Sequence, residues 1–387
     1  MLLKALMRLS AIVIAVYVVI VCILYYKEGA LLKEAFLGLS PEDALSLYKE
    51  YDVTTWTSEE LASQMLFIMN DSNDPVGLYI LAQQGIGGVV LSGNIPVDDI
   101  ADQIRWAQAE TARDIKMFIA SDEEGGSITR LQALLGELPS HAKMGSWSSR
   151  RITQTVRDYG EKLDGIGVNV ALAPVADLKV KGSYMAERQR AFAVDPDDVA
   201  RCVVAWQKGM HEAGLAVAPK HWPGMGSAND THHSAAVIHP FEILKSSDMI
   251  PFEAAFREGV EMVMVGHAVS SGLTEPNTPA TVSRQALTYL REQVGDDVII
   301  TTDAMYMSGA SGFLDISPAE AVVQSAIAGA DLVMTIVWQE GTVEELTAAI
   351  DNGRLRRTQA EDSVRRILRL KAKMGLVPVE VRDYLMQ

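Results

Sequence analysis

The chain has 387 residues, of which 48% are hydrophobic, and it carries a formal net charge of −16 at pH 7. This length allows one or two domains, and a single α/β barrel of about 250 residues also fits within it. The acidic balance would repel a phosphate backbone, so no nucleic acid is expected as a partner. Only two cysteines, Cys22 and Cys202, are present, which excludes a disulfide framework and a CxxC metal or redox site.

An apolar run without a single charge, LSAIVIAVYVVIVCILYY at residues 9–26, lies near the start of the chain. At about 1.5 Å rise per residue, a helix of this length approaches the roughly 30 Å hydrocarbon core of a bilayer. Lys4 and Arg8 precede it with no acidic residue, and this bias keeps residues 1–8 in the cytoplasm. We therefore expect a transmembrane signal anchor at residues 9–26 of a single-pass cell-membrane protein, with the bulk of the chain on the extracytoplasmic side, periplasmic or extracellular. A cleaved signal peptide is the alternative, but no A-x-A site follows the run.

Residues 27–57 are expected to form a connector, and from residue 58 onward short apolar runs alternate with longer helical stretches. Near-continuous apolar strands separated by helices indicate a parallel sheet that is covered on both faces. Eight such strands predict the fold class, an α/β protein with a single (β/α)8 TIM barrel in residues 58–387, preceded by the N-terminal transmembrane helix. An open doubly wound sheet is the alternative, but no glycine-rich phosphate turn follows the first strand. The expected strands are Gln64–Met69, Gly88–Leu91, Met117–Ala120, Val168–Leu172, Ala216–Ala218, Met262–Val265, Val298–Thr301 and Leu332–Ile336.

Polar and charged residues follow the ends of most of the predicted strands. In a barrel these positions converge on the C-terminal face, where the active site is built. The recurrence of Asp, His and Lys there predicts a functional site. The residues are Asn70, Asp71, Ser92, Asn94, Asp122, Glu123, Asp177, Lys220, His221, His267 and Asp303.

The densest group of chemically active residues is KHWPGMG at 220–226, followed by NDTHH at 229–233. Its histidines suggest a metal-dependent hydrolase as one hypothesis, but neither HExxH nor CxxC is present. The spacing of Asp230 and His232 instead suggests a carboxylate that orients an imidazole for proton transfer. We therefore expect neither a metal nor another cofactor.

Two further segments carry carboxylates that can take part in chemistry. Asp303 directly follows a strand, where it can serve as nucleophile, base or metal ligand. The segment SDEEGG at residues 121–126 places acidic side chains beside a Gly-Gly turn, with Arg130 four residues later. These carboxylates could bind the hydroxyls of a sugar or cap a helix, and the spacing leaves both readings open.

Five segments in order resemble glycoside hydrolase family 3, in its β-N-acetylglucosaminidase (β-hexosaminidase) branch. KHWPGMG with DTH is similar to the family's KHFPGHG…DSH loop, TTDAMYM to its nucleophile segment, and SDEEGGSITRL to its Gly-Gly turn. APVADL at 173–178 and ERQRAF at 187–192 match two further family segments. The resemblance extends from about residue 58 to residue 376, and it implies a (β/α)8 barrel.

The resemblance also implies a role for each matching residue. The nucleophile maps to Asp303, and the general acid/base maps to His232 with Asp230 as its carboxylate partner. This implies a retaining, exo-acting β-N-acetylglucosaminidase that forms a covalent glycosyl-Asp intermediate. The expected substrate is a β-N-acetylglucosaminide saccharide, in peptidoglycan or its fragments, and an imidazole acid/base could also admit phosphorolysis. The implied substrate-binding residues are Asp122, Arg130, Arg190, Lys220 and His221.

Two residues depart from the family pattern. Ser127 stands where the family has an arginine after Gly-Gly, and Met225 stands where it has a histidine. Neither position supplies the nucleophile or the acid/base, so we expect the chemistry to survive, and the sequence leaves the substrate specificity open. The alternative is a catalytically impaired carbohydrate-binding or cell-envelope scaffold protein on the same fold.

Overall fold

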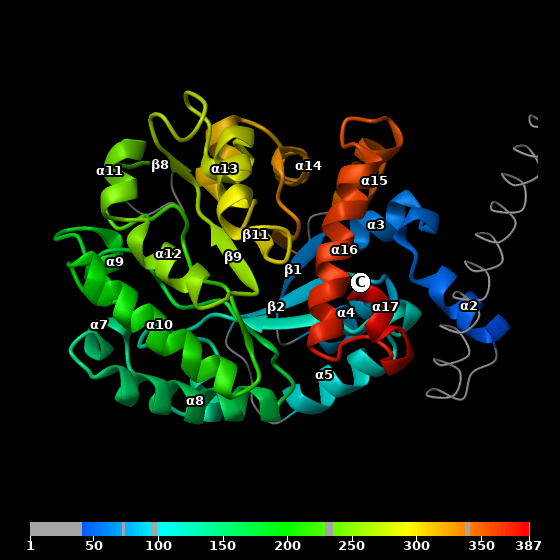
Figure 1. The fold of residues 1–387 in the computed structure, drawn as a ribbon, viewed down its shortest axis with the longest axis horizontal. Coiled ribbons are helices and arrows are strands. Elements are labelled where there is room, and N and C mark those ends of the chain that lie inside the picture. The colour runs from blue at the N-terminus through cyan, green and yellow to red at the C-terminus, as the bar shows by residue number, and fades with distance from the viewer. Residues whose placement is uncertain (1–40, 72–73, 94–98, 229–234, 337–340, 387) are drawn as a thin grey trace, which may run out of the picture.

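The computed structural model describes residues 41–71, 74–93, 99–228, 235–336 and 341–386. Parallel strands lie at the centre of the molecule, and helices surround them (Figure 1). Each of the eight predicted strand segments overlaps an observed strand. These strands are β1 (Leu66–Asp71), β2 (Gly88–Ser92), β3 (Phe118–Ser121), β6 (Val170–Ala171), β7 (Ala216–Val217), β9 (Met262–Val265), β11 (Ile299–Thr302) and β12 (Val333–Ile336).

Alternation of side chains along the strands builds two cores. In β9, Met262 and Met264 belong to an inner cluster, whereas Val263 and Val265 belong to the larger cluster beneath the helices. Successive side chains of a strand point to opposite faces, so a strand that is apolar throughout is buried on both. The inner cluster also contains Phe67 of β1 and Phe118 of β3.

The helices cover the outside of the strands. Several begin at a side-chain cap: Ser148 caps α8, and Asp195 caps α10 with Pro196 in its first turn. Helices α8, α10 and α12 pack side by side on one flank (Figure 1). The helices of four or more turns are α8 (Ser149–Gly165), α10 (Pro196–Glu212) and α16 (Arg357–Lys373). The shorter ones are α2 (Pro41–Glu50), α3 (Ser58–Gln64), α4 (Pro75–Gln83), α5 (Ile100–Ala109), α6 (Gln132–Leu135), α7 (His141–Met144), α9 (Tyr184–Glu187), α11 (Phe241–Ser246), α12 (Ile250–Arg257), α13 (Arg284–Val294), α14 (Pro318–Ala328), α15 (Thr342–Asp351) and α17 (Arg382–Leu385).

The prediction of a closed barrel is wrong for the hydrogen-bonded sheet of this structure. Six strands form one parallel sheet in the order β12-β1-β2-β3-β6-β7, and β9 and β11 form a separate parallel pair. Among the residues that the structure describes, the bridges between these two units are isolated ones, Trp222 to Val265 and Thr301 to Leu332. The segment after β7 contains Pro219 and therefore lacks one of the amide donors that a ladder needs.

Between β11 and β12, hydrogen bonds of threonine hydroxyls replace part of the backbone pairing. The Thr301 hydroxyl donates to the carbonyl of Leu332 at 2.7 Å, and the amide of Met334 donates to the Thr302 hydroxyl at 3.1 Å. These bonds keep β11 beside β12 without a regular ladder. The strand arrangement therefore follows the predicted chain order, but its ladder is interrupted at two places.

The transmembrane helix of the predicted fold class is also corrected. The longest helices described, α8, α10 and α16, have 17 residues each and carry many charges. A spanning helix needs about 20 mostly apolar residues. Within the described ranges of 41–386, no helix is long and apolar enough to cross a bilayer. The apolar run at residues 9–26 lies outside these ranges.

Candidate active site

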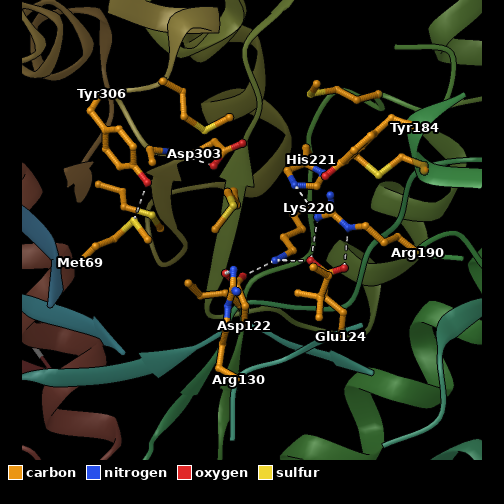
Figure 2. Close-up of a pocket in the computed structure, with 18 residues that line it drawn as sticks. Met69, Asp122, Glu124, Arg130, Tyr184, Arg190, Lys220, His221, Asp303 and Tyr306 are labelled. Carbon is orange, nitrogen blue, oxygen red and sulfur yellow. Dashed lines mark hydrogen bonds and ion pairs between the residues drawn. The ribbon is translucent and has the colours of Figure 1, made fainter. Parts of the chain in front are cut away.

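A cavity of about 190 Å³ opens at the carboxyl ends of the strands (Figure 2). Six of the eight predicted site residues line it, and they come from segments that follow β3, β7 and β11 and from the loop before α10. The other two, Asp230 and His232, lie outside the described residues. The six are Asp122, Arg130, Arg190, Lys220, His221 and Asp303.

A network of buried charges forms one wall of the cavity (Figure 2). The Nζ of Lys220 lies 2.5 Å from Oδ1 of Asp122 and 2.7 Å from Oε1 of Glu124. Arg190 donates two hydrogen bonds to Glu124, from Nε to Oε2 at 2.7 Å and from a terminal nitrogen to Oε1 at 2.8 Å. Arg130 is farther out, 3.5 Å from Oδ2 of Asp122. Each buried charge thus has a partner of opposite sign, as stable burial requires.

This pairing keeps both kinds of group ionised. Burial alone would raise the pKa of Glu124, but Arg190 and Lys220 hold it far below its ordinary value. Burial alone would lower the pKa of Lys220, but Asp122 and Glu124 raise it above its ordinary value. The wall therefore presents charged donors and acceptors, which suit the hydroxyl groups of a sugar.

The turn after β3 aims these carboxylates at the cavity. Glu123 points away from it and accepts hydrogen bonds from the Ser121 hydroxyl at 2.7 Å, the Leu131 amide at 3.1 Å and the Tyr159 hydroxyl at 2.8 Å. Burial raises the pKa of Glu123 to about 7. Gly125 follows with a φ of 93°, and a Cβ there would lie 2.1 Å from the carbonyl oxygen of Pro139. The Gly-Gly sequence is thus needed for the close approach of two backbone segments.

His221 is oriented by a buried carboxylate, Asp177. Its Nδ1 lies 2.8 Å from Oδ2 of Asp177, while Oδ1 accepts from the amide of Met225 at 2.6 Å. A hydrogen bond from Nδ1–H to the carboxylate leaves Nε2 for the cavity, where Arg190 approaches to 3.5 Å.

Asp303 follows β11, and its carboxylate faces the cavity (Figure 2). Its amide donates to the carbonyl of Val265 at 2.8 Å, and its Oδ1 accepts from the amide of Ala304 at 2.8 Å. Burial alone would raise the pKa of Asp303, but the charges of His267, His221 and Lys220 and the Ala304 amide lower it. An ionised carboxylate at a strand end can act as a nucleophile.

The chain is similar in sequence to proteins of a known family. Residues 58–370 match the Glycosyl hydrolase family 3 N terminal domain. The chain belongs to glycosyl hydrolase family 3. The resemblance predicted from the five motifs is therefore confirmed, as is the enzyme class, a glycoside hydrolase of the hexosaminidase type.

Three comparisons illustrate how this family 3 chain relates to known proteins. It is 26% identical over 324 residues to beta-hexosaminidase LpqI of Mycobacterium tuberculosis, which covers 81% of this chain and 82% of that protein. A family 3 glycosyl hydrolase from Mycobacterium smegmatis superposes with a TM-score of 0.75 at 26% identity, covering 82% of this chain and 97% of that one. A family 3 beta-N-acetylglucosaminidase from Paenibacillus gives a TM-score of 0.76 at 25% identity, covering 83% of this chain and 63% of that one.

The predicted localisation in this family 3 chain is corrected. A relative from Arthroderma benhamiae, 27% identical over 319 residues, is named an uncharacterized secreted glycosyl hydrolase. Together with the lack of a membrane-spanning helix in the described ranges, this leaves the single-pass membrane assignment without support.

The two departures from the family 3 pattern lie in different places. Ser127 is exposed and lines a separate surface groove, away from the cavity. Met225 is 1% exposed and lines the cavity itself. Of the two, Met225 is therefore positioned to affect what the cavity binds.

Several residues that line the cavity or orient its side chains were not assigned a role from the sequence. Glu124 belongs to the acidic segment and lies two residues after Asp122, and alternation along an extended chain could have placed both on one face. Asp177 was noted only as a strand-end residue. Tyr306 and Met69 carried no signal, because an isolated tyrosine or methionine is more often part of a core.

Proposed function

We propose that this family 3 enzyme removes β-linked N-acetylglucosamine from the non-reducing end of saccharides, with retention of anomeric configuration. The observation that carries the proposal is the ionised carboxylate of Asp303 beside a wall of buried, paired charges in one small cavity. Relatives named beta-hexosaminidase and beta-N-acetylglucosaminidase support the choice of sugar.

In the proposed first step, Asp303 attacks the anomeric carbon and the bond to the leaving oxygen breaks. His232, as an imidazolium that Asp230 orients, gives its proton to that oxygen. In the second step, neutral His232 takes a proton from water, the hydroxide adds to the same carbon, and Asp303 leaves as a carboxylate. Two inversions restore the original configuration. An imidazole in place of a second carboxylate removes a negative charge from the site, which would also let phosphate act as acceptor.

The charged wall supports binding of one terminal sugar. Lys220 and Arg190 can donate to vicinal hydroxyls, and Asp122 can accept from them, so a pyranose would meet donors and acceptors along one edge. A cavity of about 190 Å³ favours binding of one sugar unit over binding of a continuous polysaccharide, which supports exo action. We extend the proposal to peptidoglycan fragments in which N-acetylglucosamine is the terminal sugar.

Hydrolysis of 4-nitrophenyl β-N-acetylglucosaminide tests the proposal. We expect Asp303→Asn to lower kcat by about 10³- to 10⁵-fold, because the nucleophile is lost while the shape of the side chain is kept. The His232→Ala variant should hydrolyse natural disaccharides slowly, and its rate with the activated aryl substrate should be less reduced. Asp383→Asn, an exposed carboxylate on α17, is the matched control.

Three outcomes bear on separate parts of the proposal. No turnover of aryl or natural N-acetylglucosaminides by the wild type would overturn the assigned reaction. Turnover that survives Asp303→Asn would remove the nucleophile assignment. Activity on chitobiose but not on peptidoglycan fragments would refute only the extension to peptidoglycan, and a sugar phosphate formed in phosphate buffer would show phosphorolysis.

A further inference from the structure

Methionine side chains form much of the uncharged lining of the cavity beside Asp303. Five of them are buried, whereas Met69 is partly exposed. A thioether packs well against apolar groups, but it is open to oxidation wherever a small oxidant can reach the sulfur. Met69 is therefore the most accessible of these thioethers. The six methionines are Met69, Met185, Met225, Met264, Met307 and Met334.

The sheet fixes where the side chain of Met69 points. Met69 lies in β1, paired in register with Ile336 of β12 on one side and with Val90 of β2 on the other. Side chains two positions apart on a strand share a face, so Met69 points the same way as Phe67. Phe67 belongs to the inner cluster, and Met69 packs against that cluster at its cavity end.

The sulfur of Met69 is in contact with a residue of the nucleophile segment. The hydroxyl of Tyr306, three residues after Asp303, donates to it at 3.6 Å, and Figure 2 shows the two side chains together on one side of the cavity. Tyr306 is 37% exposed, so this contact lies where solvent enters. A small solute that enters the cavity can therefore reach the sulfur.

We propose that Met69 is an oxidation site, at which hydrogen peroxide converts the thioether to a sulfoxide and thereby lowers the activity of the enzyme. The sulfur lone pair attacks one oxygen of the peroxide, and the O–O bond breaks as the S–O bond forms. The proton on the transferred oxygen passes to the departing hydroxide, which leaves as water. Sulfur is oxidised by two electrons and the peroxide is reduced, and methionine sulfoxide reductases with a dithiol reverse the change.

The sulfoxide would change the cavity in two ways. It puts a strong hydrogen-bond acceptor beside the Tyr306 hydroxyl, where the thioether is a weak one. It also adds a dipolar oxygen to a space of about 190 Å³ that Met307, Met334 and the anionic Asp303 line. Such a group keeps water or a hydrogen-bond partner beside it, and a ligand must displace that partner to bind. We therefore expect KM to rise by a larger factor than kcat falls.

Peroxide treatment of the full chain, followed by peptide mapping and hydrolysis of 4-nitrophenyl β-N-acetylglucosaminide, tests the inference. The sulfoxide of Met69 should form before those of the buried Met264 and Met334, and kcat/KM should fall about 10-fold as it forms. Sulfoxide reductases with a dithiol should restore the rate. Met69→Leu should keep the kcat/KM of its own untreated sample. Met69→Gln, which places an amide oxygen near the same position, should have a raised KM without any peroxide.

A matched control separates Met69 from general oxidative damage. Met374 is also partly exposed and packs against the same inner cluster, but it does not line the cavity. Met374→Leu should therefore lose activity in peroxide as the wild type does, and so should Met386→Leu, which removes an exposed sulfur on the surface. The inference would be overturned if Met374 were oxidised while Met69 stayed intact. Complete oxidation of Met69 with unchanged kcat/KM, or an equal loss of activity in Met69→Leu, would overturn it as well.

Discussion

Two buried lysines lie at opposite ends of the parallel strands, and their surroundings differ. Lys220, at the carboxyl ends, is 2% exposed and lies between Asp122 and Glu124. Lys371 of α16, at the amino ends, is fully buried; its Nζ donates to the side-chain oxygen of Gln64 at 2.9 Å and lies 5.1 Å from the centre of the Phe118 ring. In the ranges that the structure describes, no carboxylate forms an ion pair with Lys371.

The pKa of a buried lysine is therefore shifted in opposite directions at the two ends of the strands. Carboxylates raise the pKa of Lys220 despite burial, whereas burial lowers the pKa of Lys371 to about 7. The end that faces the cavity keeps its charge for binding, and the closed end favours the neutral amine. Burial alone does not decide the charge of a lysine; the neighbouring groups do.

Lys220→Met should have the largest effect of the changes that break this contrast. It leaves Asp122 and Glu124 side by side without their shared cation. We therefore expect kcat/KM to fall about 10³-fold and the free energy of unfolding to fall by about 3–5 kcal/mol. Hydrolysis of the aryl substrate and urea unfolding measure both. Lys208→Met, an exposed lysine on α10, is the control. Wild-type stability and activity in Lys220→Met would contradict the assigned role of the charge network.

Lys371→Met should act in the opposite direction. The folded-state pKa of about 7 lies below the ordinary lysine value of 10.5. The unfolded chain therefore binds more protons between these values, and wild-type stability rises with pH across that window. Methionine removes this dependence and should stabilise the protein by about 2–4 kcal/mol at pH 7, with activity unchanged. Urea unfolding at pH 7 and pH 9.5 tests it, with the exposed Lys373→Met as control. A pH dependence that persists in Lys371→Met would show that another group causes it.

Glu123→Gln should give a smaller effect, in a lower pH window. Burial raises the pKa of Glu123 from 4.5 to about 7, so the folded chain binds more protons than the unfolded chain and wild-type stability falls as pH rises between these values. The Gln variant should lack this fall in the free energy of unfolding, which amounts to about 1–3 kcal/mol in the wild type. Thermal unfolding at pH 5 and pH 7.5 measures it. Equal slopes in both proteins would remove Glu123 as the titrating group.

The sequence predicted the charged residues at the carboxyl ends of the strands, but not the buried lysine at the amino ends. The apolar runs predicted the eight central strands named above, because a strand buried on both faces needs apolar side chains throughout. Asp122, Lys220 and Asp303 were identifiable because they directly follow such strands. Lys371 was not, since a lysine in the last turns of a helix usually extends into solvent and stabilises the helix end.

Two other features also depend on contacts that no local pattern contains. The interrupted ladder beside β11 results from hydroxyl bonds of Thr301 and Thr302 to the next strand. The contact between Tyr306 and Met69 on one side of the cavity joins residues that lie 237 positions apart in the chain. The acid/base pair, Asp230 and His232, stays a prediction from the resemblance.

Trapping of the covalent glycosyl-enzyme is the most direct test of the proposed role of Asp303 as nucleophile. A 5-fluoro N-acetylglucosaminyl fluoride forms the glycosyl-enzyme and slows its hydrolysis, so it can be weighed by intact-protein mass spectrometry and located by peptide mapping. We expect one fluorinated sugar per chain, on the peptide that contains Asp303, and no label in Asp303→Asn. A label on another carboxylate, or turnover of the reagent with inversion and no label, would contradict the account.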